Sequence, residues 1–171
     1  MSISLNPLTQ EVHKIPDKLD DSLRIRDFLQ KNEEKKVIVV QGLGFVGAVM
    51  SLVCANALTE EYAVIGVDLA NKNTFWKIKS INDGLFPLIA DDPKIVEFFD
   101  NAKEKGNFLA TYDPLAYRYA DVIIVDINLD VQKKAHDNGA LKNFDVNLDG
   151  FKAAIQSIGS NCKDDVLVLV E

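Results

Sequence analysis

The chain has 171 residues, of which 47% are hydrophobic and 26% are charged, and its formal net charge is −7. This length and composition are typical of one soluble globular domain with a real hydrophobic core. The acidic balance argues against nucleic acid as a partner, because nucleic-acid-binding proteins usually carry a basic stripe. No apolar run approaches the length of a bilayer span and no signal-peptide core is present, so we expect a cytoplasmic protein without membrane contact.

The first part of the chain has no clear hydrophobic period. Residues 1–21 mix Asn, Pro, Thr, Asp and Lys, which favours an extended or loosely attached arm. Ser22 is a candidate cap for a short helix whose apolar face would hold Ile25, Phe28 and Leu29. This helix would pack on the main sheet or on a partner subunit, so a homodimer is a candidate assembly.

A strand, a glycine turn, a helix and a second strand follow in close succession. The run from Lys36 to Gln41 is apolar and mostly β-branched, as in a strand buried on both faces. The next six residues, GLGFVG, fit the pattern G-x-G-x-x-G, and a helix is predicted from there to Leu58. A second apolar run covers Tyr62 to Val67 and ends on Asp68. This order is typical of a dinucleotide-binding unit.

Each glycine of the turn has a separate physical role. Gly42 permits the sharp turn out of the strand, Gly44 leaves room for the backbone to approach a diphosphate, and Gly47 lets the helix lie close to the strand. The unpaired N–H groups at the start of the helix, on Phe45 and Val46, form an anion site together with the helix dipole. A glycine turn in an unrelated α/β domain is the alternative interpretation.

Asp68 indicates which dinucleotide would bind. A carboxylate about 20 residues after the last glycine is placed to accept hydrogen bonds from an adenosine ribose diol. A 2′-phosphate at that position would meet a repulsion of order 1–4 kcal/mol at 4 Å. We therefore predict NAD rather than NADP, with a solvated strand-end or helix-cap aspartate as the alternative role for Asp68.

Further elements are predicted after Asp68. Aspartate-proline pairs at Asp92 and Asp113 mark two helix starts, the first helix ending at Gly106. In chain order, we predict a helix over 71–82, a helix over 93–105, a strand over 107–110, a brief helix from 114, a strand over 121–127, a helix closing at Gly159 and a strand over 166–170. Residues 128–144 form the longest polar stretch, and a loop of that length is usually functional or mobile.

Alternation of five apolar strands with helices predicts an α/β fold, a Rossmann-type doubly wound parallel sheet with strand order 3-2-1-4-5 and helices on both faces. We assign residues 1–35 to the arm and short helix, and 36–171 to the Rossmann domain. Ligands of such sheets bind where the strand order reverses. The glycine turn, Asp68 and the loop that begins at Asn128 should therefore surround one crevice, and Asn128 is included among the cofactor-binding residues.

Other candidate groups show no pattern typical of a site. Cys54 and Cys162 lie far apart and outside any C-x-x-C pair, so neither a disulfide framework nor a zinc site is indicated. Cys54 is interpreted as a small core residue on the predicted helix. His13 has no metal-ligand companion nearby, and no metal site is predicted.

Several motifs in order resemble the N-terminal domain of the UDP-glucose/GDP-mannose dehydrogenase family. They are GLGFVG, VIGVD, KIKSINDGLFP, ADVIIV, the helix led by FDVN, and VLVLVE, and the resemblance runs from about Val37 to Glu171. It implies an enzyme of polysaccharide biosynthesis that uses two NAD molecules to oxidise the C6 alcohol of a UDP- or GDP-sugar to a carboxylate, through an aldehyde and a cysteine-bound thioester.

The sequence also departs from that family. Members usually carry a Thr-Pro pair after the fourth strand, with the threonine near the nicotinamide, whereas this chain has Asn128-Leu129-Asp130 there. The family's thiol nucleophile lies beyond the segment that follows a glutamate matching Glu171, so we expect a truncated chain that is inactive alone. A non-catalytic nucleotide-sensing module and a 6-phosphogluconate-type or hydroxyacyl-type dehydrogenase are the alternative hypotheses.

Overall fold

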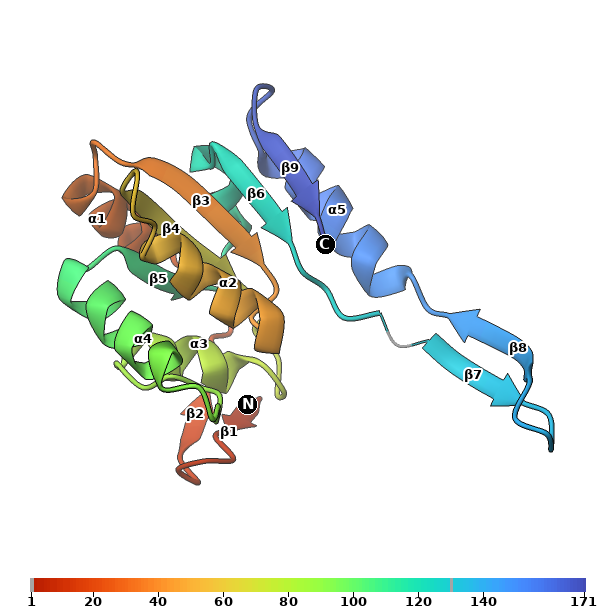
Figure 1. Cartoon of the computed structure of the whole chain (residues 1–171). Coiled ribbons are helices and arrows are strands. Elements are labelled where there is room, and N and C mark those ends of the chain that lie inside the picture. Colours follow the sequence, from red (N-terminus) through yellow and green to blue (C-terminus); the bar gives the residue numbers. More distant parts are fainter. Residues whose placement is uncertain (1, 130) are drawn as a thin grey trace.

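Five parallel strands form the main sheet of the chain, for which a computed structural model describes residues 2–129 and 131–171. The strands are β3 (Lys36–Gln41), β4 (Tyr62–Val67), β5 (Phe108–Thr111), β6 (Val122–Val125) and β9 (Leu167–Val170). They lie in the order β5-β4-β3-β6-β9, which reads 3-2-1-4-5 when they are counted along the chain (Figure 1). The predicted doubly wound parallel sheet is confirmed, and the strand order reverses between β3 and β6.

Helices cover both faces of this sheet. One face packs on α1 (Ser22–Lys31), the 3-10 helix η1 (Pro114–Tyr119) and α5 (Asp149–Asn161), with Ile25, Tyr117 and Ile158 in the shared buried cluster. The other face packs on α2 (Phe45–Ala55), α3 (Phe75–Asn82) and α4 (Pro93–Lys105), through Leu52, Ile78 and Phe99. The central strands are apolar on both sides because both of their faces are buried.

Local sequence signals fix several of the helix ends. Asp92 accepts a hydrogen bond from the Lys94 N–H at 2.9 Å, and Gly106 ends α4 in the left-handed conformation with a φ of 62°. Asp113 caps η1 in the same way, accepting from the Leu115 N–H at 2.9 Å. Other predicted bounds are wrong by a few residues. Helix α2 stops at Ala55, α3 begins at Phe75 and not at 71, and α5 continues through Gly159; the strand predicted over 121–127 is confined to β6.

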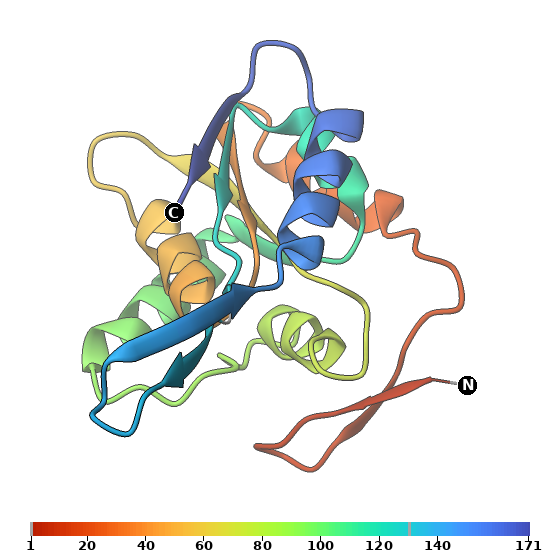
Figure 2. The same cartoon turned by 90° about the vertical axis from the view of Figure 1, so that its right-hand side faces the viewer.

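The N-terminal segment is more ordered than predicted. Its strands β1 (Ile3–Leu5) and β2 (Val12–Lys14) pair antiparallel, and the hairpin lies against α3 (Figures 1 and 2). Ser22 is not a cap, because it is the first residue of α1 and its hydroxyl donates to Asp20 at 2.7 Å. The prediction of a loose arm is therefore wrong for residues 2–21.

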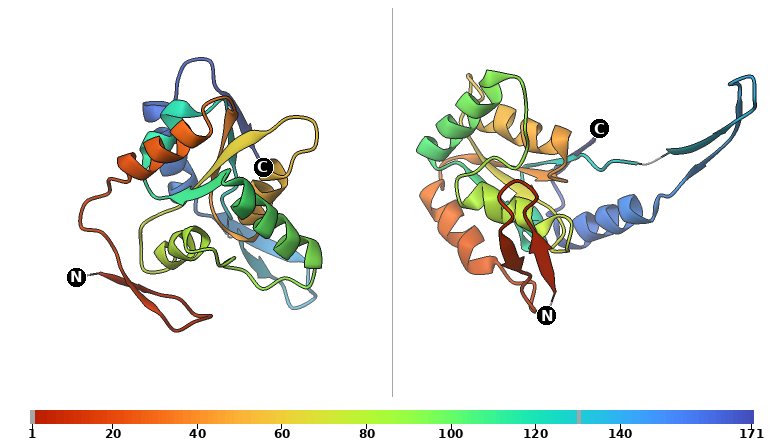
Figure 3. Two further views of the ribbon diagram at one scale, coloured as in Figure 1. Left: turned by 90° about the vertical axis from the view of Figure 1, so that its left-hand side faces the viewer. Right: turned by 90° about the horizontal axis from the view of Figure 1, so that it is seen from below.

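Residues 128–144 contain a second hairpin instead of a single polar loop. Strands β7 (Val131–Ala135) and β8 (Leu141–Val146) pair antiparallel, and Gly139 in the turn has a φ of 80°. This hairpin extends away from the main sheet (Figures 1 and 3). Asp130, between Leu129 and β7, lies outside the described residues. Among the described helices, none combines the length and apolar character that a bilayer crossing requires.

Candidate functional site

The glycine turn joins β3 to α2 at the point where the strand order reverses. Gly42 has a φ of 101°, and a Cβ there would collide with the main-chain carbonyl of Asp126 at the end of β6. A Cβ on Gly47 would collide with the Gly42 carbonyl and lie 3.0 Å from the Asp126 carboxylate. Gly47 therefore lets α2 approach the turn itself, and Gly42 lets the turn approach the neighbouring strand.

Gly44 differs from the other two glycines because it faces open space. A Cβ built on it would meet no heavy atom within 4 Å other than those of its chain neighbours, and Gly44 lines a cavity at the turn. It occupies the N-cap position of α2, where no side-chain hydrogen bond caps the helix. The side chains of Phe45 and Val46 are 58% and 49% exposed, and the N–H groups in the first turn of a helix have no partner within the helix.

Asp68 follows β4 directly and is held beside the turn. Its carboxylate accepts hydrogen bonds from the Leu43 N–H at 3.1 Å and from the Leu69 N–H at 2.7 Å. Burial raises the pKa of this carboxyl, while the two N–H groups and the charge of Lys77 act in the opposite direction. These hydrogen bonds therefore fix the orientation of the carboxylate before any ligand binds, at a cavity that is partly shielded from water.

This cavity, which we call the crevice, has a volume of about 520 Å³. Gly42, Gly44, Asp68 and Asn128 all line it, so the structure brings the start of the predicted turn, the acid and the loop together, whereas Phe45, Val46 and Gly47 are not among the lining residues. Its wall also includes residues from five other segments: Leu19 of the N-terminal segment, Thr74 and Lys77 at the start of α3, Tyr112 and Pro114 after β5, Asp126 and Ile127 after β6, and Gly150, Ala153, Ala154 and Ser157 of α5.

Sequence reasoning missed two charged groups of the crevice. Lys77 points its ammonium group at the Leu43 carbonyl, 3.3 Å away, and its charge acts on Asp68. Asp126 lies at the end of β6, and burial and the charge of Glu171 raise the pKa of its carboxyl, whereas the nearby Gly47 N–H lowers it. The available signal for Lys77 was its place at the start of a predicted helix soon after Asp68. The signal for Asp126 was an acid directly after the apolar run of β6.

Tyr117 and Gln41, which both line the crevice, form a buried hydrogen-bonded pair. The hydroxyl of Tyr117, on η1, donates a hydrogen bond to the Oε1 atom of Gln41, the last residue of β3. Burial, and secondarily the charge of Asp68, raise the pKa of Tyr117, so this hydroxyl stays protonated and keeps its donor role. The pair ties η1 to the strand that leads into the glycine turn.

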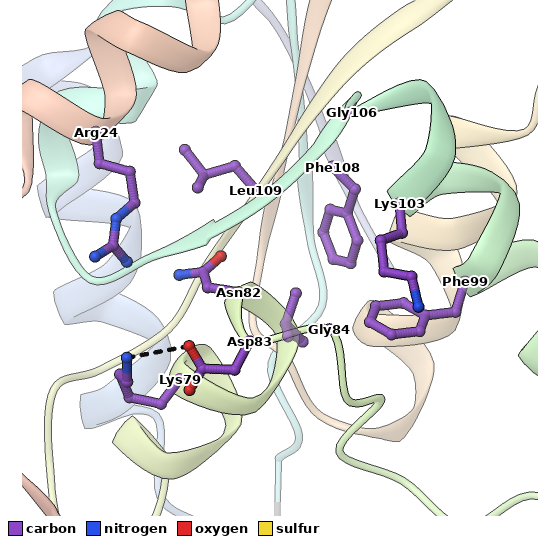
Figure 4. Close-up of a pocket in the computed structure, with 11 residues that line it drawn as sticks. Arg24, Lys79, Asn82, Asp83, Gly84, Phe99, Lys103, Gly106, Phe108 and Leu109 are labelled. Carbon is purple, nitrogen blue, oxygen red and sulfur yellow. Dashed lines mark hydrogen bonds and ion pairs between the residues drawn. The ribbon is translucent and has the colours of Figure 1, made fainter.

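A second hollow of about 530 Å³ lies at the outer edge of β5, between α3 and α4 (Figure 4). Two lysine side chains that line it form ion pairs with acids. Lys79 is 3.3 Å from Asp83, and Lys103 is 3.0 Å from Asp100. The side-chain amide of Asn82 both donates to and accepts from the main chain of Ala110, which covers part of the strand edge. Nothing of the glycine turn reaches this hollow.

The cysteines do not line the crevice. Cys54, on α2, is half-buried, and burial raises the pKa of its thiol, which disfavours the reactive thiolate. Cys162 packs beside the cluster on the α5 face of the sheet. No group of three or more metal-ligating side chains lies together within the described residues.

The sequence of the chain matches the model of a known protein family. The model of the UDP-glucose/GDP-mannose dehydrogenase family, NAD binding domain, matches residues 36–171. The chain belongs to this family. Its cofactor is therefore NAD, and the open space at Gly44 with Asp68 beside it fits that group without rearrangement of the glycine turn. The match also favours this family over the 6-phosphogluconate and hydroxyacyl types.

Solved structures share the same fold. An NDP-N-acetyl-D-galactosaminuronic acid dehydrogenase from Methanosarcina mazei aligns with 86% of the chain at 24% identity and a TM-score of 0.66. A GDP-mannose dehydrogenase from Pseudomonas aeruginosa aligns with 78% at 25% identity and a TM-score of 0.56. A UDP-D-ManNAc dehydrogenase from Pyrococcus horikoshii aligns with 79% at 23% identity and a TM-score of 0.60.

The chain spans less than a third of each of these proteins, covering 29%, 27% and 28% of their lengths. Among curated protein sequences, none matches it. The family domain is therefore established for this chain, whereas the activity of a longer protein is a matter for proposal.

Replacing Asp126 by asparagine should strengthen NAD⁺ binding about fivefold. The carboxylate shares the crevice with Gly44 and faces the Gly47 N–H, so its charge opposes a diphosphate there by roughly 1 kcal/mol. Asparagine keeps an oxygen that can accept from Gly47. Titration calorimetry at neutral pH measures the effect, and Asp100→Asn on α4 is the control for net charge. Equal or weaker binding by Asp126→Asn would contradict the assignment.

Proposed function

We propose that the chain is the NAD-binding part of a nucleotide-sugar dehydrogenase, which oxidises the C6 alcohol of a UDP- or GDP-sugar to a uronic acid. The observation that carries the proposal is the crevice, in which the open space at Gly44 and the oriented carboxylate of Asp68 lie together. The family match and the likeness to a GDP-mannose dehydrogenase support the substrate class.

The proposed roles of the residues follow from their positions. Main-chain N–H groups of Phe45 and Val46 would bind the diphosphate, with the space at Gly44 allowing its approach. Asp68 would accept hydrogen bonds from the adenosine ribose. Because the diphosphate would lie over β3 and the ribose at β4, the nicotinamide would lie on the β6 side, where Asn128 lines the crevice.

The chemistry would proceed as two hydride transfers. Each transfer moves one hydride from C6 to NAD⁺ and releases a proton. Water supplies the second oxygen of the acid, and ionisation to the carboxylate releases a third proton. A covalent intermediate needs a nucleophile at the reacting carbon. Neither Cys54 nor Cys162 lines the crevice, so we propose that this chain supplies the hydride acceptor and that turnover needs residues from outside positions 1–171.

Titration of the chain with NAD⁺ and NADP⁺ tests the proposal. We expect saturable NAD⁺ binding and an affinity for NADP⁺ at least tenfold weaker, because a 2′-phosphate would face the Asp68 carboxylate. A folded sample that binds neither nucleotide would contradict the cofactor role. Equal affinities would retain NAD binding but remove the proposed role of Asp68 in selectivity.

A non-catalytic nucleotide-sensing module is the second candidate, favoured by the absence of both cysteines from the lining of the crevice. The gene sequence after codon 171 separates the two. An open frame that encodes a cysteine-bearing second half supports the dehydrogenase, and a stop codon directly after Glu171 supports the sensor.

A further inference from the structure

The N-terminal segment lies outside the residues that match the family, yet it reaches the crevice. The match begins at residue 36, whereas Leu19 is part of the crevice wall. The segment runs from the β1–β2 hairpin below α3 to the start of α1 (Figure 2). Between the hairpin and α1, the segment passes the edge of the sheet that is formed by β5.

The hairpin end of this segment is fixed to α3 by buried polar groups. The Ser4 hydroxyl donates to the Lys72 carbonyl at 2.9 Å and accepts from the Trp76 N–H at 3.1 Å. The Asn6 side-chain amide donates to the Ser80 hydroxyl at 3.0 Å. Both Ser4 and Asn6 are buried, so these contacts are shielded from water.

The other end is fixed to the carboxyl end of β5. The Thr111 hydroxyl donates to the Asp21 carboxylate at 2.8 Å, and the Asp21 N–H donates to the Asp113 carboxylate at 2.8 Å. Leu19 lies two residues before Asp21. The segment is thus held at both ends, and Leu19 lines the crevice together with Tyr112 and Pro114, which flank the Asp113 that Asp21 contacts.

The order of the strands indicates which half of the cofactor would contact Leu19. The diphosphate turn follows β3, the ribose acid follows β4, and Tyr112 and Pro114 follow β5. With NAD bound in this way, the adenine ring would extend from Asp68 toward β5. Leu19 is 56% exposed, which leaves apolar surface for a flat ring to cover.

We propose that Leu19 forms the outer wall of the adenine subsite, so that the N-terminal segment contributes this one residue to the cofactor site. This inference rests on the proposed NAD-binding function. It assigns a ligand-contacting role to a segment that the family match leaves out, with the adenine moiety as the group recognised.

The test compares Leu19→Ala with Leu8→Ala, a control from the same segment whose side chain is 47% exposed and does not line the crevice. Leu19→Ala should weaken binding of both NAD⁺ and ADP-ribose by about fivefold, because it removes three apolar carbons from the ring contact. Binding of nicotinamide mononucleotide, which lacks adenine, should not change. Leu8→Ala should match the wild type, and Leu19→Met should restore most of the affinity.

The outcomes separate this inference from the function on which it rests. If the wild type binds no NAD⁺, the proposed function fails and the inference fails with it. If the wild type binds NAD⁺ and Leu19→Ala binds it equally well, only the role of Leu19 is overturned. An equal loss for nicotinamide mononucleotide would also overturn it, since the effect would not depend on adenine. Melting temperatures of all variants should stay within about 2 °C, as expected for exposed side chains.

Discussion

Replacing Gly44 by valine should abolish measurable NAD⁺ binding, a loss of at least about 100-fold, while the protein remains folded. The backbone at Gly44 has a φ of −69° and a ψ of −168°, a conformation that valine adopts without strain. Its Cβ would meet no protein atom within 4 Å. The two methyl groups would instead occupy the space through which a diphosphate approaches the N–H groups of Phe45 and Val46. Calorimetric titration and a thermal melt measure the two parts of the prediction.

Gly42→Ala provides the matched contrast, because the same turn is constrained differently there. Gly42 has a φ of 101°, and an added Cβ would collide with the Asp126 carbonyl. This variant should lose about 1–3 kcal/mol of folding free energy, seen as a lower melting temperature. Unchanged NAD⁺ affinity in a folded Gly44→Val protein would refute the proposed approach of the diphosphate to the backbone.

The parts of the fold that were predicted from sequence are those specified by local signals. The apolar runs of β3 and β4, the three glycines between them and Asp68 lie within about 30 consecutive positions, and each has a distinct physical cause. The capped starts of α4 and η1 were equally local, since Asp92 and Asp113 each bond an N–H two residues later. Such signals need no knowledge of distant contacts.

The missed features depend on contacts between distant segments. The β1–β2 hairpin has strands of three residues each, too short for a period to show, and its anchors Ser4 and Asn6 bond groups about 70 positions away. Asp126 reaches the glycine turn only because β6 pairs with β3 in a register that places Val125 opposite Gln41. Neither arrangement can be derived from residue spacing alone.

The β7–β8 hairpin was missed for a different reason. Its signal was present, since Asn138-Gly139 is a pair that favours a tight hairpin turn. The flanking strands are rich in Lys, Asn and Asp, and their side chains are mostly exposed, so the usual alternation of apolar and polar residues was weak. Polar composition alone led to the prediction of a loop.

Asp68 gives the second large expected effect, a change of cofactor preference. Asp68→Ala should weaken NAD⁺ binding roughly 10- to 100-fold, because charge-assisted hydrogen bonds to a ribose diol contribute about 1.5–3 kcal/mol. NADP⁺ binding should improve, since the repulsion of its 2′-phosphate is removed and Lys77 remains beside the vacated position. Paired titrations with the two nucleotides measure the shift.

Lys77 provides the decisive control for that shift. In the double variant Asp68→Ala/Lys77→Ala, the gain in NADP⁺ affinity should be smaller, because the repulsion is still relieved but Lys77 is no longer there to pair with the 2′-phosphate. If the double variant keeps the whole gain, the gain comes from the removal of Asp68 alone and Lys77 does not pair with the 2′-phosphate. If Asp68→Ala changes neither affinity, Asp68 does not contact the ribose.

The pH dependence of the wild type gives an independent measure of the same carboxylate. Burial raises the pKa of Asp68 above its ordinary value. The ribose diol donates to the ionised form, so NAD⁺ affinity should be full above this raised pKa and should fall as the pH decreases through it. Asp68→Asn cannot ionise but can still accept from the Leu43 N–H, so the part of the decrease that is due to Asp68 should be absent. An identical pH profile in the two proteins would show that this ionisation does not control binding.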